Sequence, residues 1–204
     1  MSRVAIIDTG ISNVHSIARA IEEIGADSVV TRDPRDLETA ARIVLPGVGS
    51  FPRAMRMLNE TGIAESLQEQ VIGQGIPFLG ICLGMQVMAA RGWEGGETSG
   101  LGWIPGDVRL LEPGPGERVP HVGWNTVHVV QESPLFHDVP EERDFYFVHS
   151  YALRPEQHRD VTASCDFAGG FTAAVRRDQI FGVQFHPEKS QRAGFEVLRN
   201  FLAV

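Results

Sequence analysis

The sequence predicts an α/β fold in which a central, mostly parallel sheet carries helices on both faces and an antiparallel β extension follows in the second half. Short apolar runs alternate with segments of helical periodicity over residues 4–90. Strand-like segments without long helices between them fill residues 126–185. Alternating strands and helices are typical of a parallel sheet covered on both faces. We expect residues 1–204 to form one domain, because this length buries roughly 70% of the unfolded surface without staples.

The first half is expected to consist of strand–helix units. Residues 4–8 are apolar up to Asp8, and apolar residues then recur at helical spacing. Residues 8–12 lack the G-x-G-x-x-G fingerprint, which disfavours a dinucleotide site at this turn. The expected elements are strand 4–8, helix 14–24, strand 28–31, a short helix or turn over 34–41, strand 42–45, and helices over 51–58 and 63–72.

The second half has a different composition. Residues 91–102 are rich in glycine and acids, and residues 112–116 form a second cluster of Gly and Pro, so both are predicted loops around a strand at 108–111. The remaining expected elements are strands 126–130, 144–153, 161–164, 171–176 and 180–185, and a closing helix over 191–202.

Composition and charge exclude several classes of function. Lysine and arginine total 18 against 26 acidic residues, a net charge of −8, which argues against a nucleic-acid partner. The N-terminus reaches Asp8 too early for a signal peptide, and no apolar run is long enough to span a membrane. Cys82 and Cys165 form no CxxC pair or Cys/His cluster. We therefore expect no metal site and a reducing, cytoplasmic location.

Residues 77–86 form the stretch with the clearest chemical potential. An apolar run ends at Cys82, which lies between Gly80 and Gly84, and a helix is expected over 85–90. This order of strand, sharp turn and helix corresponds to a nucleophile elbow with Cys in place of Ser. Unpaired amides at the start of such a helix favour negative charge on sulfur and on an adjacent oxyanion. On its own the pattern also fits a buried cysteine that only packs.

Two other segments complete the candidate chemistry. Residues 46–49 (PGVG) follow a predicted strand. If the sheet places this segment beside Cys82, its backbone amides supply half of an oxyanion hole. The alternative is a turn that only connects a strand to a helix. His186 and Glu188 end another strand, and side chains two residues apart in an extended segment project to the same side. A carboxylate placed there holds the imidazole tautomer and leaves its other nitrogen facing a nucleophile.

These motifs carry a family resemblance. Residues 46–49 (PGVG), 80–86 (GICLGMQ) and 185–188 (FHPE) resemble the class I (triad) glutamine amidotransferases, in that family's order and over nearly the whole chain. Residues 120–125 and 147–151 narrow the resemblance to the glutaminase subunits of imidazole glycerol phosphate synthases. The chain departs from that pattern in the first loop, because the family has an aromatic residue directly after the position of Asp8 and a glycine at the position of Ser12.

The resemblance implies hydrolysis of glutamine to glutamate and ammonia through a thioester, with no cofactor and no metal. It assigns Cys82 as nucleophile, His186 as general base and acid, and Glu188 as the residue that orients His186. The other implied positions are an oxyanion hole from Gly47, Val48 and Leu83, and glutamine binding by Gly49, Gln86 and the segment His149, Ser150 and Tyr151.

The resemblance also implies a partner. In that subfamily a (β/α)8 cyclase subunit binds the glutaminase as a heterodimer and uses the ammonia to make imidazole glycerol phosphate and aminoimidazole carboxamide ribonucleotide in histidine biosynthesis. Trp124, placed in an expected Gly-Trp-Asn loop, is the candidate interface anchor, since exposed Trp is enriched at hot spots, and its alternative is a core position. The other candidate interface residues are His121, Asn125 and Lys189.

Three alternatives remain open at the level of sequence. The first is a glutaminase that serves another synthase, of the anthranilate or aminodeoxychorismate type. The second is a γ-glutamyl hydrolase-like Cys hydrolase or peptidase, which shares the elbow. The third is a catalytically silent binding subunit.

Overall fold

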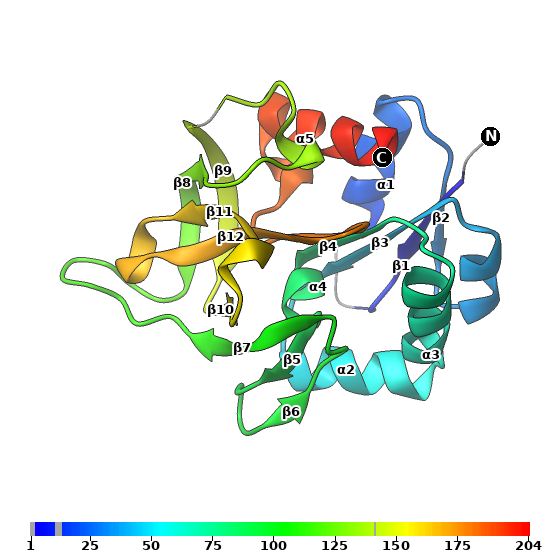
Figure 1. The fold of residues 1–204 in the computed structure, drawn as a ribbon, viewed down its shortest axis with the longest axis horizontal. Helices are drawn as coiled ribbons and strands as arrows, with labels where there is room; N and C mark the ends of the chain where they lie inside the picture. Colours follow the sequence, from blue (N-terminus) through cyan, green and yellow to red (C-terminus); the bar gives the residue numbers. More distant parts are fainter. Residues whose placement is uncertain (1–2, 11–13, 141) are drawn as a thin grey trace.

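The computed structural model describes residues 3–10, 14–140 and 142–204. Its strands are β1 (Val4–Ile7), β2 (Ser28–Thr31), β3 (Arg42–Gly47), β4 (Phe78–Cys82), β5 (Ala89–Gly92), β6 (Thr98–Ser99), β7 (Ile104–Leu110), β8 (His121–Val129), β9 (Glu142–His149), β10 (Tyr151–Pro155), β11 (Val161–Cys165), β12 (Phe171–Arg177) and β13 (Ile180–Val183). The main sheet has nine strands in the order β2-β1-β3-β4-β13-β12-β11-β8-β9 (Figure 1).

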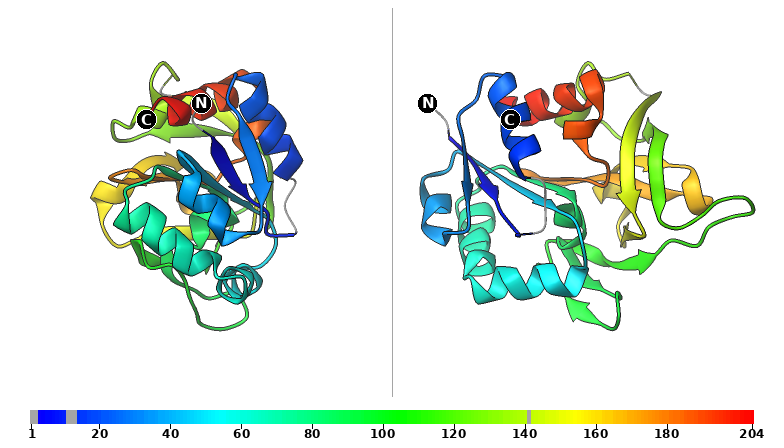
Figure 2. Two further views of the ribbon diagram at one scale, coloured as in Figure 1. Left: turned by 90° about the vertical axis from the view of Figure 1, so that its right-hand side faces the viewer. Right: turned by 180° about the vertical axis from the view of Figure 1, so that it is seen from behind.

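Helices cover both faces of the parallel part of this sheet. The α-helices are α1 (Val14–Glu23), α2 (Phe51–Glu60), α3 (Ile63–Leu67), α4 (Leu83–Gln86) and α5 (Gln191–Ala203), and α3 continues as a π-helical turn over Gln68–Gly73. Figures 1 and 2 show α1 and α5 on one face and α2 and α3 on the other. This confirms the predicted α/β class.

The first strand shows why two cores form. All four residues of β1 are fully buried. Val4 and Ile6 pack into the core that includes α1 and α5, whereas Ala5 and Ile7 pack into the core that includes α2 and α3. Successive side chains of a strand point to opposite faces, so a continuous apolar run is what a strand buried on both faces requires.

The sheet changes from parallel to antiparallel within the C-terminal half. β2, β1, β3, β4 and β13 pair in parallel, and β12, β11, β8 and β9 continue the sheet with antiparallel pairs. The predicted strand over residues 144–153 is in fact two strands, because the chain turns at Ser150 and β10 joins a second sheet. The predicted strand at 126–130 begins earlier, at His121, so Trp124 lies in β8 and not in a loop.

A second, four-stranded sheet has the order β10-β7-β5-β6. The prediction of a helix over residues 85–90 is wrong, because α4 ends at Gln86 and β5 starts at Ala89. Pairing of Ala89 with Ile104 in β7 overrides the local helical propensity. Gly100 lies so close to this turn that an added Cβ would be 2.1 Å from the Ala89 carbonyl oxygen.

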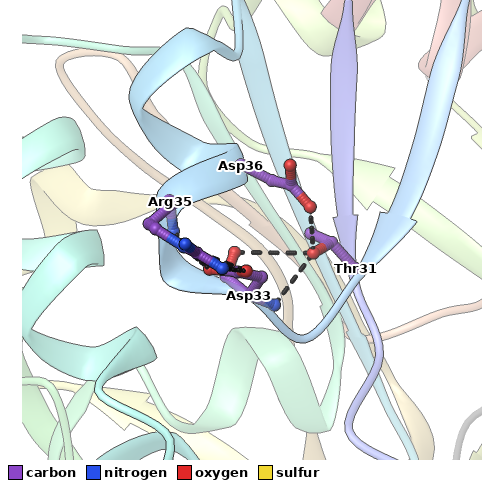
Figure 3. Close-up of polar contacts among 4 residues, drawn as sticks. All are labelled: Thr31, Asp33, Arg35 and Asp36. Atoms are coloured by element: carbon purple, nitrogen blue, oxygen red, sulfur yellow. Dashed lines mark hydrogen bonds and ion pairs between the residues drawn. The ribbon is translucent and has the colours of Figure 1, made fainter.

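A polar cluster lies between the end of β2 and the next helix. The segment 34–41, predicted as a short helix or turn, contains a 3₁₀ helix over Pro34–Thr39. The side chain of Asp33 accepts a hydrogen bond from the Arg35 amide at 3.0 Å, and Thr31 donates to the carboxylate of Asp36 (Figure 3). Hydrogen bonds from the side chain and the amide of Arg35 lower the pKa of Asp33 to about 2. Asp and Ser/Thr side chains at such positions satisfy amides that a helix start leaves free.

The described residues include no helix that is both long enough and apolar enough to cross a membrane. The first loop is described up to Gly10, whose amide donates to Asp8 at 2.7 Å. Ser12, one of the positions where the sequence departs from the family pattern, lies outside the described residues.

Candidate active site

Three adjacent parallel strands bring the predicted segments together. β4 lies between β3 and β13, so the carboxyl ends of all three meet at one edge of the sheet. Gly47 at the end of β3 pairs with Cys82 at the end of β4. The chain passes from Val183, paired with Ile81, directly toward His186. Ligand sites of open α/β sheets lie at such an edge.

Cys82 occupies a sharp turn with unusual backbone angles. Its φ is 54° and its ψ is −108°, an arrangement that is costly for a residue with a side chain. Two glycines allow the turn. An added Cβ at Gly84 would lie 1.7 Å from the Leu45 carbonyl oxygen, and one at Gly80 would lie 2.5 Å from the Gly84 carbonyl oxygen. The elbow is therefore packed backbone to backbone against β3, with the sulfur at its tip.

The helix after this turn is short. α4 has four residues, so few aligned peptide dipoles add up behind Cys82. We therefore attribute stabilisation of charge on the sulfur chiefly to neighbouring side chains. The first amides of any helix lack intrahelical partners, which keeps the Leu83 N–H available beside the sulfur.

His186 and Glu188 form a buried pair. His186 Nδ1 lies 3.0 Å from Glu188 Oε1, and both side chains are about 5% exposed or less. The pairing does not come from an extended strand as predicted, because Pro187–Lys189 form a 3₁₀ turn. The His186 amide donates to the Tyr146 carbonyl at 2.9 Å, and Ser190 Oγ donates to the His186 carbonyl at 2.6 Å, which holds the turn in place.

The imidazole of His186 also interacts with the Cys82 thiol. Burial acts to lower the pKa of His186, but interactions with the Cys82 thiol and with Glu188 outweigh it and raise the pKa to about 10. Nε2 is buried and has no aligned hydrogen bond to a described residue, so it remains available for proton transfer. The sulfur itself lies 3.8 Å from the Val148 carbonyl oxygen in β9.

Replacing Glu188 tests this pair. A histidine whose pKa is raised from 6.5 to about 10 stabilises the fold below pH 6.5, and that contribution disappears as the pH rises toward 10. Glu188→Gln removes the carboxylate that pairs with the imidazolium, so we expect the pKa of His186 to fall and the dependence of unfolding free energy on pH to shrink over this range. Nuclear magnetic resonance titration of the imidazole measures the first effect.

The matched control for this experiment is Glu196→Gln, which removes the carboxylate that pairs with Arg199 on the surface of α5. This variant should leave the pKa of His186 unchanged. An unchanged titration in Glu188→Gln would contradict the assigned pairing.

Gln86 is tied into the protein by its amide. Its Nε2 donates to the Tyr151 carbonyl at 2.7 Å and to Gln184 Oε1 at 3.1 Å, so both N–H groups are engaged and only the oxygen remains for a ligand. Gln184, which sequence reasoning missed, is fully buried, and its Nε2 lies 3.5 Å from Cys82 Sγ. Its position two residues before His186 was the available signal, since residues two apart in an extended segment share a side.

His149 and His121 form a buried pair behind this site. His149 Nδ1 donates to the Tyr151 carbonyl at 2.9 Å, and its Nε2 lies 3.1 Å from His121 Nδ1. Burial lowers the pKa of His149 to about 3, so its ring is neutral. His121 is stacked between Phe147 and Phe167, so its ring lies inside the protein and not on the surface where an interface residue would lie.

The remaining predicted interface residues lie at or near the surface. Trp124 is 47% exposed and Val122, on the same face of β8, is 57% exposed. Trp124 contacts Tyr146 across the strand pair, and Lys189 Nζ lies 5.6 Å from the Tyr146 ring centre. We call the group formed by Val122, Trp124, Tyr146 and Lys189 the hairpin patch. Asn125 is half-buried, with Nδ2 3.4 Å from His121 Nε2.

The loop at Gly47–Ser50 has a support that sequence reasoning also missed. Glu94, from the Gly-rich segment after β5, accepts a hydrogen bond from the Phe51 amide at 2.8 Å. This bond ties the start of α2, and the loop before it, to the second sheet. Gly49 in this loop is exposed and has a φ of 102°, a region that favours glycine.

No group of His, Cys, Asp and Glu side chains among the described residues has the geometry of a metal site. The second cysteine, Cys165, is fully buried, and burial raises the pKa of its thiol to about 11. A buried thiol beside an imidazole–carboxylate pair, with the first amide of a helix next to it, is suited to nucleophilic attack on a carbonyl carbon.

Comparison with known proteins gives concordant results. The sequence matches the family Glutamine amidotransferase class-I over residues 5–204. It is 44% identical to "Imidazole glycerol phosphate synthase subunit HisH 1" of Campylobacter jejuni (strain RM1221), over 98% of this chain and 100% of that protein. It is 45% identical to "Imidazole glycerol phosphate synthase subunit HisH" of Caulobacter vibrioides, over 99% of this chain and 98% of that protein. The solved structure of PurLQS from Thermotoga maritima shares the fold, with a TM-score of 0.76 and 19% identity, over 99% of this chain and 98% of that one.

Proposed function

This chain belongs to the class I glutamine amidotransferases, and from that premise we propose that it is the glutaminase subunit of an imidazole glycerol phosphate synthase. It hydrolyses the side-chain amide of glutamine, and the ammonia serves histidine biosynthesis. The observation that carries the chemistry is the parallel pairing of β4 with β13, which places Cys82 and the His186–Glu188 pair at one edge of the sheet.

The reaction proceeds in two halves. The Cys82 thiolate attacks the amide carbon of glutamine, His186 gives its proton to the departing nitrogen, and ammonia leaves behind a thioester. His186 then takes a proton from water, which attacks the thioester carbon, so that glutamate leaves and the thiolate returns. Glu188 holds the imidazole so that Nε2 faces the reacting atoms.

Backbone amides are the proposed oxyanion donors. The Leu83 N–H lies at the start of α4, and the Gly47–Val48 turn lies beside it, since an added Cβ at Gly47 would be 2.9 Å from the Leu83 Cβ. Loss of one such donor typically costs about 2.7 to 4 kcal/mol of transition-state stabilisation. Glutamine itself would be held by Gly49, by the oxygen of Gln86 and by the backbone at His149, Ser150 and Tyr151.

The hairpin patch is the proposed partner surface. β9 connects this patch with the candidate active site. It contributes the Tyr146 side chain to the patch, whereas the Tyr146 carbonyl accepts from the His186 amide and the Val148 carbonyl lies beside Cys82 Sγ. A (β/α)8 cyclase bound there would receive ammonia close to where it forms, before protonation makes it unreactive. We also propose that residues 1–204 act as one glutaminase domain in the cytoplasm, where the free thiols Cys82 and Cys165 stay reduced.

Mixing with candidate partners tests this function. We expect glutamine hydrolysis to rise roughly tenfold or more with the imidazole glycerol phosphate cyclase and its ribonucleotide, a typical size for coupling between sites. Trp124→Ala should weaken binding of that cyclase by about 30-fold, equivalent to about 2 kcal/mol for a hot spot, and an excess of cyclase should restore the stimulation. Ammonia release, followed as a function of cyclase concentration, measures both.

Ile72→Ala is the control, because Ile72 is 43% exposed but lies outside the hairpin patch, and it should bind the cyclase like the parent chain. Equal stimulation by an anthranilate or aminodeoxychorismate synthase would reassign the partner. Faster turnover of γ-glutamyl peptides than of glutamine would favour a hydrolase of the second class.

A further inference from the structure

One buried amide beside the nucleophile has no part in the reaction steps above. Gln184 follows β13 directly, is fully buried, and points its Nε2 at Cys82 Sγ at 3.5 Å. A buried polar side chain is costly unless its hydrogen bonds are made. The sulfur is therefore the partner that satisfies this end of the Gln184 amide.

The hydrogen-bond network determines which end of the amide faces the sulfur. The Tyr151 carbonyl only accepts, so the group of Gln86 that contacts it at 2.7 Å must be the NH₂. The second N–H of Gln86 then donates to Gln184 Oε1 at 3.1 Å. Because the oxygen of Gln184 is used in this way, its NH₂ faces Cys82.

The Tyr151 carbonyl is itself held by a second donor. His149 Nδ1 donates to it at 2.9 Å, which leaves His149 Nε2 as the acceptor for His121 Nδ1 at 3.1 Å. Two lines of donors therefore diverge from the Tyr151 carbonyl, which accepts from His149 on one side and from Gln86 on the other. On the second side the donors run from Gln86 to Gln184 and from Gln184 to the sulfur, and this direction is fixed because the carbonyl cannot donate.

We propose that Gln184 is a catalytic residue of the glutaminase reaction that donates a hydrogen bond from Nε2 to the Cys82 thiolate, and that Gln86 is a positioning residue that holds the Gln184 amide in this orientation. Its role in turnover rests on the proposed function; its contact with the sulfur does not. A hydrogen bond to a charged group is stronger than one between neutral groups, so the contact favours the thiolate over the thiol.

The contact acts in both halves of the reaction. Before attack it holds the electron pair on sulfur that forms the new C–S bond. When water attacks the thioester, the C–S bond breaks and its electron pair returns to sulfur, where the Gln184 N–H again stabilises the charge. Glutamine hydrolysis as a whole consumes one water and needs no further reactant for this role.

Alkylation of Cys82 by iodoacetamide tests the contact without any turnover of glutamine. The thiolate displaces iodide, so the rate reports how much thiolate is present. All variants carry Cys165→Ala, which leaves Cys82 as the single thiol. At pH 7 we expect Gln184→Met, which keeps the length but loses the donor, to react about tenfold more slowly than its parent, the loss typical of a hydrogen bond to a charged group.

Two further substitutions sharpen the test. Gln184→Glu is nearly isosteric but turns a carboxylate toward the sulfur, and should slow alkylation at least as much. Gln86→Met frees the Gln184 amide to rotate and should slow alkylation by a smaller factor. The matched control is Gln179→Met, because Gln179 Nε2 donates to the Val71 carbonyl at 2.7 Å, away from the elbow, and alkylation should keep the parent rate.

Steady-state kinetics with the cyclase then tests the role in turnover. Gln184→Met should lower kcat for glutamine about tenfold and change KM by less than about twofold, since Gln184 contacts the reacting sulfur. Circular dichroism verifies that each variant is folded. Alkylation of folded Gln184→Met and Gln184→Glu at the parent rate would overturn the proposal. If the parent chain alkylates as expected but hydrolyses no glutamine with any partner, the proposed function fails while the Gln184 contact stands.

Discussion

Cys82→Ala should reduce cyclase-stimulated glutamine hydrolysis by at least about 10⁴-fold, equivalent to about 5.5 kcal/mol of transition-state stabilisation. In the proposed mechanism the sulfur forms the covalent bond of the thioester, and Cys165 cannot replace it, since Cys165 is fully buried on β11, three strands away from β4 in the sheet. The residual activity would come from the oxyanion amides and from substrate binding alone. Ammonia release with saturating cyclase measures the loss.

Cys165→Ala makes the same chemical change at a fully buried cysteine outside the site, and should retain most of the activity. Cyclase binding by Cys82→Ala, measured by calorimetry, shows that the fold survives. If Cys82→Ala kept partner-stimulated hydrolysis, Cys82 would lose its role and the chain would fall into a different class of enzyme.

Gly84→Ala should destabilise the protein by more than about 3 kcal/mol, even though alanine is the smallest possible addition. The new Cβ would lie 1.7 Å from the Leu45 carbonyl oxygen, so β3 and the elbow must separate. Backbone atoms on both sides cannot rotate away as a side chain does. Because Gly47 lies next to Leu83 at the same contact, the separation also moves the proposed oxyanion amides apart, and activity should fall with stability.

Gly73→Ala provides the comparison, since the nearest atom to an added Cβ there is 4.0 Å away and Gly73 ends the π-helical turn. We expect no destabilisation for this variant, because alanine favours helical backbone over glycine. Urea unfolding of both variants gives the free energies. Equal midpoints for Gly84→Ala and the parent chain would show that the elbow can open at no cost.

Local patterns along the chain predicted most of the first half. The strand at residues 28–31 and the helix that starts at Phe51 lie where the sequence placed them, because the first is a short run of β-branched residues and the second has apolar residues at helical spacing. The elbow at Cys82 was also predictable, since strand, glycines and turn all lie within ten residues of one another. The catalytic role of Cys82, His186 and Glu188 remains a prediction that the experiments above decide.

The second half shows where local reasoning stops. One apolar stretch became β9 and β10 in two different sheets, and the residues after Gln86 left the helix to pair with β7. His121 has the polar side chain of a surface residue, yet it is buried between aromatic rings. In each case the outcome depends on a partner strand or ring that lies far away in the sequence.

The sequence alone determined the class of fold, the strand–turn segment that carries Cys82 and the family, because periodicity and short motifs are local properties of the chain. Only the tertiary structure decided that α4 is one turn long, that Trp124 lies on an exposed strand, and that Gln184 faces Cys82 across 102 residues. Parallel pairing of β4 with β13 creates that last contact. Which strands pair is settled by the burial of the whole core, and no single segment carries that information.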